Sequence, residues 1–92
     1  MKLIEAIRDL DFLGDENTIY AVEPWTQDSQ VIVVPEPDAG GLPAEARKLG
    51  MKYFLEVFLI RDFLSDWVSN LKREPTLQEK CTRLIQYAVT DA

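Results

Sequence analysis

The sequence predicts an α+β fold, a small and mainly antiparallel three-stranded sheet with helices packed on one face, in the order α-β-β-(short α)-β-α-α. Apolar residues recur at helical spacing near both ends of the chain. Between them lie short segments rich in β-branched and aromatic residues, which proline and glycine separate. The 92 residues suit one domain, so we expect residues 1–92 to form a single acidic globular unit.

The first element expected is an amphipathic helix over residues 2–10. Apolar side chains fall on one side of it and charged ones on the other. Phe12 and Leu13 should pack against the core after this helix, and Gly14 begins a turn.

Two strands follow, over residues 19–22 and 30–35, and prolines close both. They are near enough in the sequence to pair as an antiparallel hairpin. Its loop is longer than a tight turn and carries Trp25 and Asp28.

A short helix over residues 43–50 comes next, because Pro43 suits a first helical turn and Gly50 a left-handed cap. Together with the irregular loop before it, this helix should cross the sheet. The stretch "KYFLEVFLI", residues 52–60, then predicts the third strand from its aromatic and β-branched content. A helix is the alternative there, because a continuous apolar run does not distinguish the two.

Two helices complete the chain. Asp62 can cap the first, which should end near Arg73, before Pro75. Thr76 and Glu79 stand three residues apart, the signature of a capping box at the start of the second. Their predicted apolar stripes are Phe63, Leu64, Trp67, Val68 and Leu71, and then Leu77, Cys81, Leu84, Ile85 and Ala88.

Glu56 is the one carboxylate in the third predicted strand. Alternation would turn Tyr53, Leu55, Val57 and Leu59 toward the helices, and Phe54, Glu56, Phe58 and Ile60 away from them. A lone ionised carboxylate is unfavourable in a dry interior, so Glu56 is expected at the rim or on an open face. A buried pair with Arg47, Lys48 or Arg61 is the alternative. A catalytic acid would need a second group that the sequence does not mark.

On the face that points away from the helices, Phe54 and Phe58 are either covered by the loop at residues 35–43 or form an interaction patch.

The acidic residues are concentrated in the first part of the chain. Residues 1–38 hold two basic and nine acidic residues, net −7, whereas residues 39–92 are net +1. This sign disfavours nucleic acid and anionic membranes as partners and favours a basic protein.

Most catalytic and metal-binding constellations are excluded by composition. There is no histidine and only one cysteine, Cys81, so the usual Ser/His/Asp, Cys/His and zinc arrangements cannot form. "DAGGLP" lacks the context of a phosphate loop, and "DLDFLGDE" lacks the spacing of a calcium loop. We therefore expect no cofactor or metal. Glu5, Arg8 and Asp9 interrupt any export signal, and the apolar runs are too short for a membrane span, so a cytoplasmic location is expected.

In size, acidity and lack of catalytic groups, the chain resembles small bacterial immunity proteins that neutralise polymorphic toxins. The segments "IYAVEPW", "YFLEVFLIRDFL" and "LIQYAVTDA" are also similar to a small bacterial family with no assigned activity. The resemblance implies a non-enzymatic blocker of a toxin and assigns no role to any residue.

These observations predict a protein-binding domain that blocks a basic partner such as a toxin nuclease by electrostatic steering and steric occlusion. Trp25 would be its anchor, although packing of Trp25 on the core is the alternative. The other predicted binding residues are Asp11, Asp15, Glu16, Glu23, Asp28, Glu36 and Asp38. The alternative functions are a homo-oligomeric structural or accessory protein, dimerising through a strand edge or the Phe54/Phe58 face, and a small carboxylate-dependent enzyme.

Overall fold

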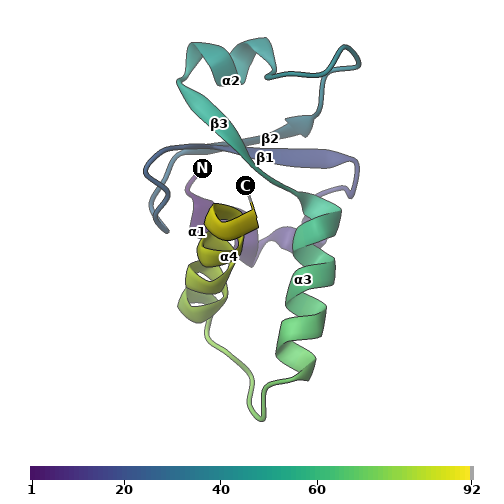
Figure 1. Ribbon diagram of the computed structural model, residues 1–92, viewed down its shortest axis with the longest axis vertical. Helices are drawn as coiled ribbons and strands as arrows, with labels where there is room; N and C mark the ends of the chain where they lie inside the picture. The colour runs from purple at the N-terminus through teal and green to yellow at the C-terminus, as the bar shows by residue number, and fades with distance from the viewer. Residues whose placement is uncertain (92) are drawn as a thin grey trace.

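A three-stranded antiparallel sheet with the strand order β2-β1-β3 lies at the centre of the computed structural model, which describes residues 1–91 (Figure 1). The α+β fold class and the predicted order of elements are confirmed. The elements are α1 (Leu3–Arg8), a 3-10 turn η1 (Leu10–Phe12), β1 (Asn17–Val22), β2 (Val31–Pro35), α2 (Ala44–Lys48), β3 (Met51–Glu56), α3 (Val57–Ser69) and α4 (Leu77–Asp91).

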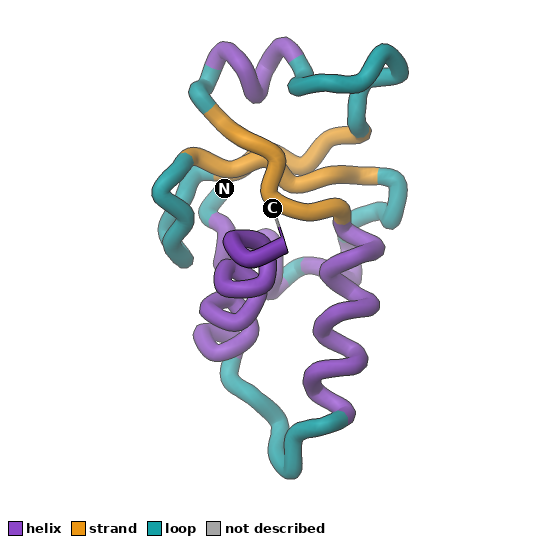
Figure 2. The backbone as a smooth tube through the Cα atoms, viewed as in Figure 1, coloured by secondary structure: helices purple, strands orange, loops and turns teal. Residues whose placement is uncertain are grey.

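The prediction that the helices pack on one face holds for α1, α3 and α4 but is wrong for the short helix α2, which lies on the other side of the sheet (Figures 1 and 2). α1, α3 and α4 pack on one face and enclose the main core, to which β1 contributes Ile19 and Ala21. On the opposite face α2 covers a smaller cluster of Tyr20, Ala46 and Met51, flanked by Leu42. The short helix is therefore a lid over part of the second face, and β1 is buried from both sides.

The pairing of β3 with β1 contains a β-bulge, which breaks the predicted alternation. Ile19 lies opposite Leu55, but the next residue, Tyr20, lies opposite Tyr53, so Phe54 is the extra residue. An extra residue lets neighbouring side chains point to the same side, and both Phe54 and Leu55 enter the main core, with Phe54 only 1% exposed. Tyr53 instead packs edge-on against Tyr20, at 6.4 Å between ring centroids.

The predicted third strand over residues 52–60 is wrong beyond Glu56. Thr18 and Glu56 form the last pair of the β1–β3 ladder, and the chain turns into α3 at Val57. Helical spacing then places Val57 and Ile60 in the main core. The helical alternative is therefore correct for the second half of this apolar run, and Asp62 lies inside α3 and does not cap it.

The predictions for the last helix are confirmed. The Thr76 backbone N–H donates to Glu79 Oε1 at 2.9 Å, and the Glu79 N–H donates to Thr76 Oγ1 at 3.1 Å, which is a complete capping box. The hydrogen bond from Arg73 and that from the Thr76 backbone lower the pKa of Glu79 to about 2. Cys81 and Leu84 are fully buried, as the stripe predicted.

The region after α1 differs from its prediction. α1 ends at Arg8, and η1 then turns Phe12 outward, so that its side chain is 88% exposed and not packed against the core. Leu13 is half-buried beside the main core. The loop geometry decides this difference, because a 3-10 turn has three residues per turn and cannot bury Leu10, Phe12 and Leu13 together.

The bulge predicts that two phenylalanines four residues apart differ in their importance for stability. Replacing Phe54 with Ala should lower the free energy of unfolding by about 3–4 kcal/mol, because a large buried side chain is lost. Phe58→Ala is the matched control, since Phe58 is 44% exposed. It should cost less than about 1 kcal/mol by urea denaturation. Equal losses would contradict the bulge.

Candidate acidic binding surface

The eight predicted binding residues do not form one surface. Glu23, Trp25 and Asp28 lie in the loop that joins β1 to β2. Asp15 and Glu16 precede β1, and Glu36 follows β2, so these three lie at the other end of the hairpin, where Asn17 pairs with Pro35. Asp11 is in η1, and Asp38 lies farther along the loop to α2.

Trp25 packs on the protein itself. Its ring meets Phe54 edge-on, with 5.0 Å between ring centroids, and its Nε1–H donates to the Ala21 carbonyl at 3.4 Å. The side chain is half-buried beside the main core. This arrangement matches the alternative reading of Trp25 and gives it a structural role.

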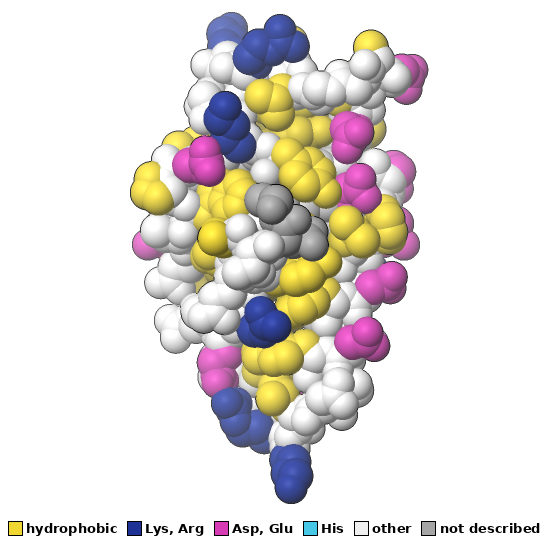
Figure 3. Space-filling view, in the orientation of Figure 1, with side chains coloured by type: hydrophobic (Ala, Val, Ile, Leu, Met, Phe, Trp, Pro, Cys, Tyr) yellow, Lys and Arg dark blue, Asp and Glu magenta, His cyan; other side chains and the backbone are white. Residues whose placement is uncertain are grey.

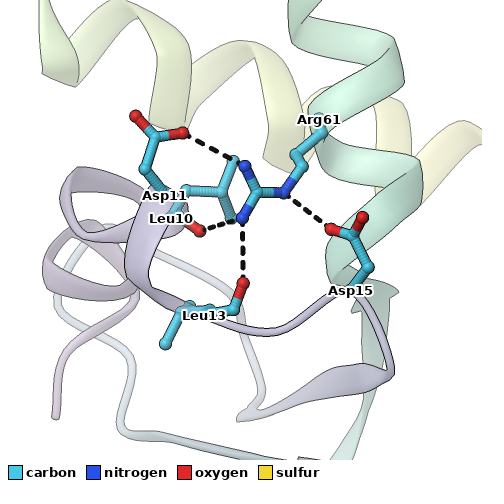
Figure 4. Close-up of polar contacts among 5 residues, drawn as sticks. All are labelled: Leu10, Asp11, Leu13, Asp15 and Arg61. Atoms are coloured by element: carbon cyan, nitrogen blue, oxygen red, sulfur yellow. Dashed lines mark hydrogen bonds and ion pairs between the residues drawn. The ribbon is translucent and has the colours of Figure 1, made fainter.

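Arg61 neutralises two of the predicted acids (Figure 4). Its Nε lies 2.7 Å from Asp15 Oδ1, although the N–H does not point at that oxygen, and its Nη1 lies 3.1 Å from Asp11 Oδ1. Nη2 donates to the carbonyls of Leu10, at 2.7 Å, and Leu13, at 2.9 Å. One guanidinium group from α3 therefore holds the whole connection between α1 and β1. Asp28 is likewise paired, with Lys2 at 3.5 Å.

Three of the carboxylates that form no ion pair lie together at one end of the sheet. A shallow hollow of about 220 Å³ lies there, which we call the acidic hollow. Among the described residues Glu16, Glu36 and Glu56 form no ion pair. The exposed ring of Phe58 stands in the same hollow. Its lining residues are Asp15, Glu16, Asn17, Thr18, Glu36, Glu56 and Phe58.

Four residues of this hollow were not among the predicted binding residues, and two of them, Glu56 and Phe58, come from the junction of β3 and α3. Glu56 is half-buried at the strand end, which agrees with the rim position expected for it, and it forms no pair with Arg47, Lys48 or Arg61. Only the end of β3 at Glu56 brings both residues to this place. The sequence signal would have been the helical spacing of Val57 and Ile60, which marks where the strand stops.

Charge is unevenly distributed over the face drawn in Figure 3. Carboxylates are most numerous along the side where the strand ends meet α3, others lie on the opposite side, and basic groups lie at the two tips and on the face between them. The basic tips correspond to α2, with Arg47 and Lys48, and to the turn after α3, with Lys72 and Arg73. On the acidic side the Arg61 guanidinium is paired with Asp15, which also lines the acidic hollow.

A second hollow adjoins the first and shares Glu36 with it. It has a volume of about 280 Å³ and is lined by Tyr20, Glu36, Gly41, Leu42 and Tyr53, and we call it the tyrosine hollow. Tyr20 is 1% exposed, and its hydroxyl has no hydrogen-bond partner among the described residues. Burial raises the pKa of the phenol, and the negative charges of Glu36 and Glu56 raise it further. The Thr18 hydroxyl opposes this pKa shift but is not placed for an ordinary hydrogen bond.

A groove elsewhere on the molecule has a different character. It measures about 630 Å³ and runs between α1, α3 and α4 over an apolar floor that includes Ile7, Leu64 and Leu77. Its charged rim is paired internally, for example Lys80 with Glu74 at 3.2 Å. This pairing leaves the groove without a charge that would select a partner.

Other chemistry finds little support in the described part of the chain. Burial raises the pKa of the Cys81 thiol to about 11, so it is a poor nucleophile at neutral pH. Within residues 1–91 no group of three or more His, Cys, Asp or Glu side chains is arranged to hold a metal ion. Over the same residues, no helix combines the length and apolar character that crossing a bilayer requires.

Comparison of the chain with protein-family models, with curated proteins and with solved structures gives no match.

The Arg61 contacts predict a large stability loss when the guanidinium is removed. Arg61→Met should lower the free energy of unfolding by about 2–3 kcal/mol, because two carbonyls and two carboxylates lose their partner. Arg73→Met removes a guanidinium from an exposed pair with Glu79 and should cost much less. Chemical denaturation of both variants tests this, and equal losses would mean that Arg61 does not organise the α1–β1 connection.

The unpaired hydroxyl of Tyr20 predicts that its removal does not harm the fold. Tyr20→Phe should leave the protein as stable as the wild type or more stable by about 1 kcal/mol, since a buried polar group without a partner is unfavourable. Urea denaturation measures this. A clear loss of stability would show that the hydroxyl has a partner in solution.

Proposed function

We propose that the protein is a non-enzymatic binding domain that docks a basic protein partner on the acidic end of its sheet. The observation that carries this proposal is the acidic hollow, where Glu16, Glu36 and Glu56 surround an exposed Phe58 without a counter-ion among the described residues. A patch that joins unpaired charge to an exposed aromatic ring has the composition of an interface centre with a charged rim.

The mechanism has two steps. Unpaired carboxylates on one side of the molecule attract a basic partner over roughly one Debye length, about 8–10 Å, and orient it as it approaches. Phe58 then replaces Trp25 as the apolar contact, because Trp25 is already packed against Phe54. Occupation of the partner's basic surface would block whatever that surface binds.

The class of partner follows from the charge. A nuclease-type toxin is one example, since an enzyme that binds nucleic acid needs a basic surface that contacts phosphates. An acidic domain that covers this surface would inhibit the enzyme without any chemistry of its own. This role agrees with the resemblance to toxin-immunity proteins.

The proposal is tested by identifying a protein that co-purifies from the native host and measuring its affinity for charge-reversed variants. Glu36→Lys and Glu56→Lys should each weaken binding at least tenfold, and raising the salt concentration should weaken wild-type binding. Isothermal titration calorimetry gives the dissociation constants.

Glu23→Lys is the matched control. It makes the same change in net charge at the opposite end of the hairpin, where Glu23 is exposed, and it should change the affinity less than about threefold. Binding that is insensitive to salt, or equally weakened by all three variants, would contradict docking at the acidic hollow. A complex between two copies of the chain, found by sedimentation and unaffected by these reversals, would favour the homo-oligomeric alternative.

A further inference from the structure

We infer that the tyrosine hollow and the acidic hollow together form a receptor for a single guanidinium group, an arginine side chain presented by the basic partner. The choice of a protein side chain rests on the proposed function, whereas the guanidinium site itself is tested separately below. Four features of this part of the sheet support the inference: shared orientation, an unpaired acceptor, aromatic walls and the number of acceptors.

Strand register places the relevant side chains on one face. Thr18 pairs with Val34 on one side and with Glu56 on the other, so Glu56 lies on the same face as Thr18 and Tyr20. Glu36 follows Val34 by two residues and lines the tyrosine hollow beside Tyr20. The two carboxylates therefore flank one end of the Tyr20 side chain, on the face that α2 covers only in part.

The Tyr20 hydroxyl is the feature that an acidic surface alone does not explain. The phenol is almost fully buried and lines the tyrosine hollow, yet the described residues offer its oxygen no hydrogen bond. Tyr20 and Glu36 line the tyrosine hollow together, and Glu36 also lines the acidic hollow, so the Tyr20 side chain lies near the place where the two hollows meet. A ligand with N–H donors would satisfy this oxygen and both carboxylates at once.

Aromatic rings line both hollows. Tyr53 is 40% exposed and stands edge-on to Tyr20, and Phe58 is exposed in the acidic hollow. The face of an aromatic ring attracts a cation, and the planar guanidinium of arginine stacks on such rings more readily than an ammonium group does.

The number and nature of the acceptors favour guanidinium over other cations. Two carboxylates and a phenol oxygen match the five diverging N–H donors of arginine better than the three of lysine. A metal ion is disfavoured, because the described residues contain no cluster suited to bind one. The tyrosine hollow, at about 280 Å³, has room for one side chain but is small for a drug-sized ligand.

The site is tested with N-acetyl-arginine-methylamide as the probe and the full chain as the protein. Titration followed by NMR should give saturable shifts of Tyr20, Tyr53 and Thr18, with a millimolar dissociation constant. The Tyr20→Phe and Glu36→Gln variants should each weaken binding about tenfold, as expected for a lost hydrogen bond to a charged group. The lysine analogue of the probe should bind several-fold more weakly.

Matched variants control for folding and for charge. Tyr87→Phe removes a hydroxyl from a ring stacked on Phe63, and Glu23→Gln removes a carboxylate from the other end of the hairpin. Both should bind the probe as the wild type does. The inference is overturned if the probe does not saturate, if Tyr20→Phe and Tyr87→Phe bind it equally, or if the arginine and lysine analogues bind alike.

The outcome also separates this inference from the proposed function. If the affinity of a basic partner depends on Glu36 and Glu56 but is unchanged by Tyr20→Phe, the docking surface is supported and the guanidinium receptor is overturned. If the arginine probe binds saturably but the affinity of the partner is unchanged by Glu36→Lys, the guanidinium site is supported and the docking surface is overturned.

Discussion

The β-bulge at Phe54 is the constraint on which the rest of the structure depends. One extra residue in β3 lets Phe54 and Leu55 enter the same core and leaves Tyr53 on the opposite face beside Tyr20. The ring of Phe54 then provides the surface on which Trp25 packs. Without the bulge, Tyr53 or Phe54 would have to change faces, because a shift of one residue reverses the direction of every side chain beyond it.

The end of β3 sets the positions of Arg61 with its partners and of the acidic hollow. Because the strand stops at Glu56, α3 starts at once, and its first turns bury Val57 and Ile60 while presenting Arg61 to the α1–β1 connection. Asp11 and Asp15 both form ion pairs with Arg61 there. Glu56 itself remains at the strand end, where it lines the acidic hollow with Glu36 and forms no ion pair with Arg61.

The sequence predicts the helices well where one periodic pattern acts alone, and the last helix with its Thr76–Glu79 capping box is the best example. It predicts the strand at residues 52–60 poorly, because the first part of that apolar run is a strand and the second part is a helix. Where the strand ends depends on how far β1 extends as its partner. The candidate site was predicted only in part for a related reason. The sequence shows which acidic residues are present but not which of them are paired with a cation. Asp11, for example, is paired with Arg61, which lies about 50 positions away in the sequence.

Distance along the hairpin separates the acids at its two ends. β1 has six residues, so its ends are separated by roughly 17 Å at about 3.3 Å per residue. This exceeds the Debye length of about 8 Å at physiological ionic strength, so Glu23 and Asp28 contribute little field at the acidic hollow.

Selectivity at that end then has to come from short-range contacts, and Tyr20 is the group placed to supply them. A phenylalanine would fill the same space beside Ala46 and Met51 without leaving a polar atom unpaired. A buried hydroxyl that lowers stability is understandable if a bound ligand donates the hydrogen bond that it lacks. A site that requires this hydrogen bond distinguishes between ligands more strongly than charge alone does.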